Sequence, residues 1–389
     1  MPHGNHPDDD YPAAEIPGGG KISGQSPQSG ISDIPEKFRW QTAAGTLAVA
    51  GAGGGIAYLA GLPLPWLIGA QIALCIVALA RFEIFGARPQ WPAVTRNLFL
   101  PVLGVMVGGS FSTGVFQDMT AWWPSLILLS IFILLVHTII CFGFRRFGGY
   151  DFPTAFFASF PGGFIEAAVL GGESGGNQRV ILVQHFLRVS LIVFAVPLIF
   201  WVNRGEAVGS AAGLAGVQAP AAGPADFAVL AVAGLVGTLI SRKLKLPASD
   251  ISGAMAASAM VHALGWADGS LPPALIAVTQ LMIGTSLGVG FAGVSRAEIV
   301  RAIGLAIPAF AIVFASAVAI GLLFDDTLGT TTEALILAFT PGGLPEMSLV
   351  ALSLHLSVPF VALHHLYRIL FTMAVLPAVY RAAAKWGKV

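Results

Sequence analysis

Two short stretches of this sequence repeat one pattern of residues that could do chemistry, Pro-Gly-Gly followed by glutamate. The first reads SFPGGFIEAAV at 159–169, and the second reads FTPGGLPEMSL at 339–349, 180 residues later. Proline removes a backbone donor and Gly-Gly permits a sharp reversal, so each motif predicts a break in a helix. Glu166 and Glu346 would then lie in the first turn after the break, where free backbone N–H groups favour negative charge.

A second repeated pattern places a histidine and an arginine on one helix face. His185 precedes Arg188 by three residues, and His365 precedes Arg368 by the same spacing. Residues three apart are neighbours on a helix surface. Arg188 lies about 12 Å along a helix from Val180, which is too deep for exposure to lipid to be tolerated. Each arginine therefore needs a carboxylate, backbone carbonyls, water or an anionic ligand.

Together the two patterns give the candidate substrate-binding residues, and we expect no catalytic residue, no metal site and no cofactor. The candidates are Pro161, Gly162, Gly163, Glu166, His185, Arg188, Pro341, Gly342, Gly343, Glu346, His365 and Arg368. In a structural interpretation, each glutamate caps its helix and pairs with the arginine of its own half. In a functional interpretation, these groups bind an anion, a metal ion or protons. Gln184 stands where the second copy has His364, so the two copies are not identical.

The composition places these motifs in a membrane. The chain has 389 residues, of which 56% are hydrophobic and 10% charged. Soluble domains have about 25% charged residues, so we predict an all-α, polytopic membrane protein. The formal net charge is zero, which argues against direct contact with nucleic acid. The expected partners are the lipid bilayer and an unknown small solute or ion; a homo-oligomer is left open.

Hydropathy divides the chain into two sets of six apolar segments. The first set is 41–61, 65–80, 96–115, 123–144, 152–172 and 180–202, and the second is 227–243, 248–265, 272–293, 299–324, 332–355 and 358–382. Most can cross about 30 Å of hydrocarbon as helices. All 8 tryptophans lie at segment ends, which is typical of an interfacial aromatic belt.

The two sets read as an internal duplication. Residues of the Pro-Gly-Gly and His-Arg patterns match at an offset of 180, whereas LPLPWLIGA at 62–70 matches LPASDISGA at 246–254 at an offset of 184. Such register over a long span indicates a repeat. The expected organisation is a disordered cytoplasmic tail at 1–38, membrane repeat 1 at 39–204, a linker at 205–226 and membrane repeat 2 at 227–389.

Lysine and arginine predict opposite orientations for the two halves. In the first half, basic residues such as Arg81 and Arg145 follow the second and fourth segments. In the second half, basic residues such as Arg242 and Arg296 follow the first and third segments instead. Since basic loops favour the cytoplasm, the halves are inverted if each Pro-Gly-Gly segment dips into the membrane and returns. Both termini are then cytoplasmic. A broken helix that crosses fully is the alternative.

Two glycine runs, GAGGG at 51–55 and GVMVGG at 104–109, predict surfaces where helices pack closely. They lack the context of a phosphate-binding loop.

The paired motifs, with QHFLRV and HHLYRI following them, resemble the AbrB family of bacterial membrane proteins over about residues 42–382. Members are named as regulators of gene expression and sometimes as ammonia monooxygenases, and they are grouped distantly with inverted-repeat cation and anion transporters. The resemblance implies a multi-pass protein of the bacterial inner membrane. It does not extend to the small soluble DNA-binding family that shares the name.

We expect an inner-membrane protein of transporter-like architecture that regulates gene expression indirectly, through solute transport or sensing. The alternative is a secondary transporter of a small solute or ion without a regulatory role. An enzyme is not expected, because a membrane copper site needs clustered histidine and carboxylate ligands and the 8 histidines form no such cluster outside the tail.

Overall fold

The structure is a computed structural model that describes residues 38–204 and 222–386. Within these ranges the secondary structure is helical, apart from one isolated bridge between Ile84 and Ala87. The all-α prediction is therefore confirmed. The predicted tail and most of the predicted linker lie outside the described residues; α10 begins at Pro224, inside the range assigned to the linker.

The helices of the first half follow the predicted segments closely. They are α1 (Trp40–Leu59), α2 (Pro65–Ala80), α3 (Ala93–Gly108), α4 (Thr113–Asp118), the short 3-10 helix η1 (Met119–Ala121), α5 (Trp123–Arg146), α6 (Phe152–Ala158), α7 (Phe164–Glu173) and α8 (Gln178–Arg204). Those of the second half are α10 (Pro224–Lys243), α11 (Ser249–Ala263), α12 (Pro273–Val289), α13 (Arg296–Leu328), α14 (Thr332–Phe339), α15 (Leu344–Ser353) and α16 (Val358–Trp386).

Six of the described helices are long and apolar enough to cross a membrane, namely α1, α5, α8, α10, α13 and α16. The chain is therefore a multi-pass membrane protein. The predicted single segment 96–115 is wrong in one respect: α3 ends at Gly108, and the chain bends by 86° before it continues as α4 and η1. The bend lies in the four-residue break from Gly109 to Ser112, which hydropathy alone does not reveal.

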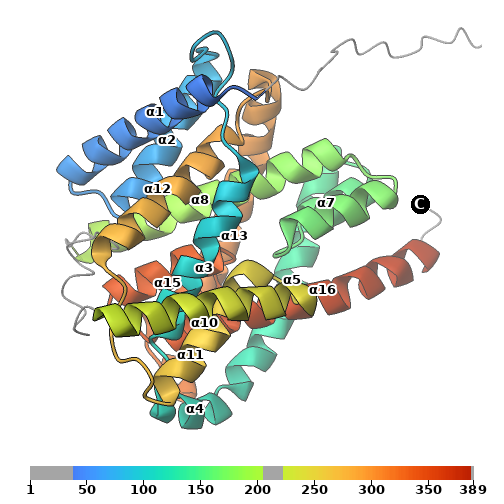
Figure 1. Cartoon of the computed structure of the whole chain (residues 1–389). Coiled ribbons are helices and arrows are strands. Elements are labelled where there is room, and N and C mark those ends of the chain that lie inside the picture. Colours follow the sequence, from blue (N-terminus) through green and yellow to red (C-terminus); the bar gives the residue numbers. More distant parts are fainter. Residues whose placement is uncertain (1–37, 205–221, 387–389) are drawn as a thin grey trace, which may run out of the picture. The chain divides into compact units, whose positions relative to one another are not determined.

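The helices pack in two groups (Figure 1). In the first group α1, α2 and α12 lie side by side, and α3 packs against α10, α11 and α12. The second group contains α5 to α8 and α13 to α16. Helix α3 joins the groups through α15 and α16. Both interrupted helix pairs, α6 with α7 and α14 with α15, therefore belong to one group.

Glycines allow helix backbones to touch in the first group. A Cβ added to Gly104 of α3 would lie 2.6 Å from the carbonyl oxygen of Ile251 in α11, which is too close for any side chain. The equivalent residue of the second half, Gly284 of α12, approaches the carbonyl oxygen of Leu67 in α2 in the same way. Small residues at such crossings are typical of packed membrane helices.

The duplication also extends to unusual backbone conformations. Positive φ angles recur at matched positions of the two halves, namely Gly61 and Lys245, Leu64 and Ala248, Arg81 and Gly265, Gly149 and Gly329, and Gly175 and His355. Left-handed residues are uncommon outside glycine, so their recurrence in register indicates that the halves share one backbone plan.

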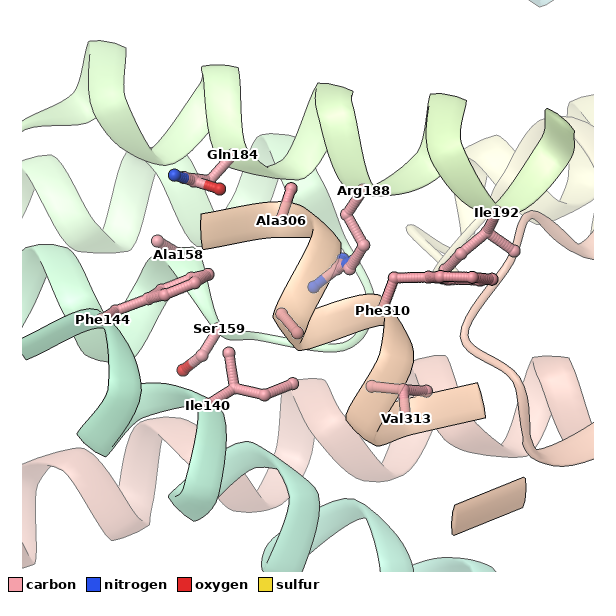
Figure 2. Close-up of a pocket in the computed structure, with 11 residues that line it drawn as sticks. Ile140, Phe144, Ala158, Ser159, Gln184, Arg188, Ile192, Ala306, Phe310 and Val313 are labelled. Atoms are coloured by element: carbon pink, nitrogen blue, oxygen red, sulfur yellow. The ribbon is translucent and has the colours of Figure 1, made fainter. Parts of the chain in front are cut away.

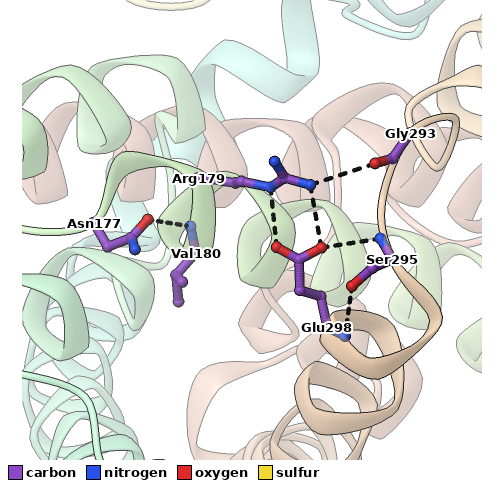
Figure 3. A network of polar contacts seen from close by, with 6 residues as sticks. All are labelled: Asn177, Arg179, Val180, Gly293, Ser295 and Glu298. Carbon is purple, nitrogen blue, oxygen red and sulfur yellow. Dashed lines mark hydrogen bonds and ion pairs between the residues drawn. The ribbon is translucent and has the colours of Figure 1, made fainter. Parts of the chain in front are cut away.

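A polar network links the starts of two helices of the second group, α8 and α13 (Figure 3). Arg179 at the start of α8 forms an ion pair of 3.0 Å with Glu298 in the first turn of α13, and it also donates to the carbonyl oxygen of Gly293. Glu298 completes a capping box with Ser295. These contacts hold the starts of α8 and α13 together.

The start of α13 also contacts the ends of two first-half helices. Arg296 Nε donates to the carbonyl oxygen of Leu79 near the end of α2, at 3.2 Å. Arg301 donates to the carbonyl oxygen of Gly148, just after α5. Because α5 and α13 hold equivalent places in the two halves, the contact of Arg301 places the start of one beside the end of its counterpart.

Candidate functional site

The first Pro-Gly-Gly motif forms the tip of a helical hairpin made of α6 and α7. Asp151 caps α6 by accepting a 2.7 Å hydrogen bond from Thr154 N. Thr154 Oγ1 in turn accepts a 2.7 Å bond from Asn177 N, beyond the end of α7. The two ends of the hairpin are therefore adjacent, which is the geometry of a re-entrant segment. Gly163 supplies the left-handed turn at the tip, with φ 59°.

The end of α6 is held by the His-Arg pair of α8. His185 Nε2 donates to the carbonyl oxygen of Phe157 at 2.8 Å, and Arg188 Nη1 donates to that of Phe160 at 2.6 Å. Arg188 Nη2 lies 3.0 Å from His185 Nδ1. Since the guanidinium can only donate, His185 Nδ1 accepts and the imidazole proton lies on Nε2. The pair thus satisfies carbonyls that a broken helix leaves without intrahelical partners.

The second half repeats this arrangement 180 residues later. His365 Nε2 donates to the carbonyl oxygen of Leu337 at 3.0 Å, and Arg368 Nη1 donates to that of Thr340 at 3.0 Å. Arg368 Nη2 lies 2.7 Å from His365 Nδ1 and 2.8 Å from the carbonyl oxygen of Gly342. The sequence prediction that each His-Arg pair shares one helix face is met in both halves.

The predicted pairing of each arginine with the glutamate of its own half is wrong. Both guanidinium groups bind backbone carbonyls instead, and neither glutamate forms an ion pair with them among the described residues. The reason is local: the arginine follows the end of the first half-helix, whereas the glutamate lies on the second half-helix beyond the tip. Glu166 is exposed, and Glu346 is 4% exposed with no partner for its Oε2.

Arg96 of α3 is a charged neighbour that the motifs do not reveal. Its guanidinium carbon lies 5.7 Å from the ring centroid of Phe164, next to the first tip, and α3 also packs against α15, which follows the second tip. Helix α3 therefore connects the first group of helices to both interrupted segments. The Nε of Arg96 is buried without a partner.

Each tip also packs against the long final helix of the other half. A Cβ on Gly162 would lie 3.6 Å from Ile369 of α16, and one on Gly342 would lie 3.0 Å from Ile192 of α8. Each motif is thus held against the other half of the chain.

The two tips differ in detail. Pro161 and Gly162 are half-buried, whereas Pro341 and Gly342 are buried. Gly343 has φ −74° and ψ 142°, an extended conformation where Gly163 is left-handed. The second tip is therefore closed inside the protein, and the first is more open.

A small cavity lies beside the first His-Arg pair (Figure 2). Its volume is about 20 Å³, and Arg188, Gln184 and Ser159 line it together with apolar residues of α5, α8 and α13. Gln184 is 2% exposed, and its Oε1 has no hydrogen-bond partner. The cavity could not be read from the motifs, because it depends on which side chains meet across three helices.

Comparison with known proteins gives the family. The chain matches the family described as "Transition state regulatory protein AbrB" over residues 28–384. The chain belongs to the AbrB family. The resemblance drawn from the paired motifs is confirmed.

Two relatives cover most of the chain. "Uncharacterized protein YhjN" of Bacillus subtilis (strain 168) is 28% identical over 364 residues, which span 86% of this chain and 91% of the relative. "Putative regulator AbrB" of Escherichia coli (strain K12) is 24% identical over 332 residues, which span 82% of this chain and 90% of the relative. This member of the AbrB family therefore has close to the full length of both relatives.

Proposed function

We propose that this AbrB-family protein is a membrane carrier or sensor of a small solute or ion, and that any effect on gene expression is indirect. The supporting observation is a pair of Pro-Gly-Gly tips that each pack against the final helix of the other half and are each tied to a His-Arg pair by backbone carbonyls. Interrupted backbone at membrane depth is tolerated where it is buried in protein or lines a cavity. Paired interrupted helices are typical of solute sites in secondary transporters.

The proposal includes an inverted relation between the halves, in the inner membrane of a bacterium. The contact of Arg301 with Gly148 supports it, since it brings the start of α13 to the end of its counterpart α5. A direct, parallel duplication would instead place the starts of α5 and α13 on one side. The hairpin geometry of α6 and α7 supports the re-entrant form that this inversion requires.

The printed name of the Escherichia coli relative supports a regulatory role. For this chain we propose that the role acts through solute flux or sensing, without direct contact with nucleic acid, and we propose no enzymatic activity. The alternative is a carrier without any regulatory role.

One experiment separates these functions. Cells lacking their own copy would receive wild type, Glu346→Gln or the exposed-site control Arg146→Gln, with protein levels matched by immunoblot. Transcript profiles and intracellular pools of small solutes would be measured in parallel. We expect Glu346→Gln to change both and Arg146→Gln to change neither.

The other outcomes discriminate clearly. Altered pools with unaltered transcripts would favour the carrier without regulation. Altered transcripts with unaltered pools would contradict regulation through transport and leave sensing. If deletion itself changes neither quantity, the proposed function is wrong.

A further inference from the structure

The two buried arginines occupy matched positions but have different surroundings. Arg368 is 2% exposed and donates to two backbone carbonyls, those of Thr340 and Gly342, as well as to His365. Arg188 donates to one carbonyl, that of Phe160, and retains some exposed surface. Arg368 is therefore engaged mainly in holding its hairpin, whereas Arg188 has donors to spare.

The charge of Arg188 lacks compensation. Arg188 forms no ion pair with a carboxylate of the described residues, and its Nε is buried without a partner. A buried charge without a counter-charge is strongly unfavourable. Backbone carbonyls reduce this cost but do not supply a negative charge.

Space for a counter-ion lies on the Arg188 side. The cavity of Figure 2 lies against Arg188, with Ser159 and Ala309 on its walls. The residues at the matched positions are Phe339 of α14 and Leu129 of α5, and both of these larger side chains are fully buried. The corresponding space beside Arg368 is thus filled by apolar groups.

Gln184 provides a second polar contact in the cavity. Its Nε2 donates to Tyr150 Oη at 3.0 Å, and its Oε1 is the atom without a partner. Rotation of the terminal amide would direct the NH₂ group into the cavity while Tyr150 Oη donates to Oε1. The second half has His364 here, and that side chain is already bound to Ser125 at 2.8 Å.

Side-chain contacts connect Gln184 to the protein surface. Tyr150 bonds Gln184 on one side, and on the other its ring lies 5.5 Å from the guanidinium carbon of the exposed Arg301. The residues at the matched positions are Thr330 and Ala121, which carry neither an aromatic ring nor a positive charge. The positive charges of Arg188 and Arg301 favour anions over cations on this side of the protein.

We infer that the cavity beside Arg188 binds a small monovalent anion, held by the Arg188 guanidinium and the Gln184 amide. The volume of about 20 Å³ restricts the ligand to the smallest anions, such as chloride or nitrate, with slight widening of the walls. A single water molecule would also fit such a volume, but it would leave the charge of Arg188 uncompensated. This inference rests on the proposed carrier or sensor role, because it names the class of solute.

Anion titration of the purified, detergent-solubilised full chain tests the inference. The thermal midpoint would be followed while sodium gluconate is replaced by sodium chloride or sodium nitrate at constant ionic strength. Wild type should show a saturable rise. Arg188→Gln removes the cation and should weaken the apparent affinity about tenfold or more, as expected for the loss of a charge-assisted hydrogen bond. Ala309→Val fills the cavity while Arg188 remains, and it should also weaken the apparent affinity about tenfold or more.

The exposed-site control Arg146→Gln removes the same charge from the end of α5 and should titrate like wild type. If Arg188→Gln does not fold, Ala309→Val decides the result. No saturable response in wild type, or an unchanged response in Ala309→Val, would overturn the inference and leave a water-filled cavity. Anion binding without solute flux would contradict the carrier role and leave this anion site standing. Flux of another solute without anion binding would contradict this anion site and leave the carrier role standing.

Discussion

At the scale of single residues, the two His-Arg pairs act as caps for interrupted helices. A helix that stops inside an apolar bundle leaves carbonyl oxygens that water cannot reach. His185 with Arg188, and His365 with Arg368, supply donors to the carbonyls that end α6 and α14. The imidazole orients the guanidinium through its Nδ1, so the two side chains form one unit.

Truncating the second arginine should destabilise the protein more than truncating the first. Arg368→Leu leaves the buried carbonyl of Gly342 and one imidazole nitrogen without a donor, and the carbonyl of Thr340 keeps only the bond from Gly342 N. This should cost roughly 3 kcal/mol or more. Arg188→Leu leaves one carbonyl and one imidazole nitrogen, roughly 2 kcal/mol, and also removes an uncompensated charge. Thermal midpoints of the two monodisperse variants and of wild type in detergent would show which substitution costs more stability. Equal or reversed losses would contradict the structural assignment of Arg368.

Glu166→Gln should not rescue Arg188→Leu. An ion pair between Glu166 and Arg188 would make the double change less harmful than Arg188→Leu, because it would leave no unpaired charge. In the structure Glu166 is exposed and Arg188 binds the carbonyl of Phe160, so the effects of the two substitutions should add within about 0.5 kcal/mol. Folded yield and thermal midpoint of wild type, both single variants and the double variant would form the cycle. A double variant more stable than Arg188→Leu would restore the pairing hypothesis.

At the scale of helices, close backbone crossings give the first group its rigidity. Gly104 meets the backbone of α11, whereas Gly55 of α1 has no atom within 4 Å of a Cβ added there. Both glycines lie within helices, so the same substitution at each separates crowding from helix propensity.

Gly104→Ala should therefore destabilise by about 1–3 kcal/mol, as overpacking does, while Gly55→Ala should be neutral or stabilise by up to about 1 kcal/mol. Thermal unfolding of both purified variants, beside wild type, would measure this difference in sign. A stabilising Gly104→Ala would show that α3 and α11 are not in backbone contact.

The elements were largely predictable because their signals are local. Hydropathy located the long helices, and Pro-Gly-Gly located both interruptions. The partners of Arg188 were not predictable, because every residue has a backbone carbonyl and no residue type marks the one that accepts the bond. Arg96 was missed because its contact with Phe164 depends on how α3 crosses the tips. The difference between Ser159 and Phe339 was visible in the aligned halves, yet its meaning required the neighbouring helix α13.

At the scale of the whole molecule, basic residues of both halves gather on one face. Arg39 of the first half donates to the carbonyl of Phe85, and Arg296 of the second half donates to that of Leu79. Near the other terminus, Tyr380 of α16 stacks with Phe152 at the start of α6. The starts of α1, α6 and α13 and the end of α16 therefore share a side, and a basic loop favours the cytoplasm.

This arrangement predicts that both termini are cytoplasmic and that the segment between the halves lies outside. Green fluorescent protein and alkaline phosphatase would be fused in turn after residues 38, 215 and 389. Fluorescence without phosphatase activity is expected at 38 and 389, because each adjoins the basic face. The reverse is expected at 215, because an odd number of crossings separates it from the N-terminus once α6 and α7 form a re-entrant hairpin. Fluorescence at 215 would mean that this hairpin crosses the membrane and that the halves are not inverted.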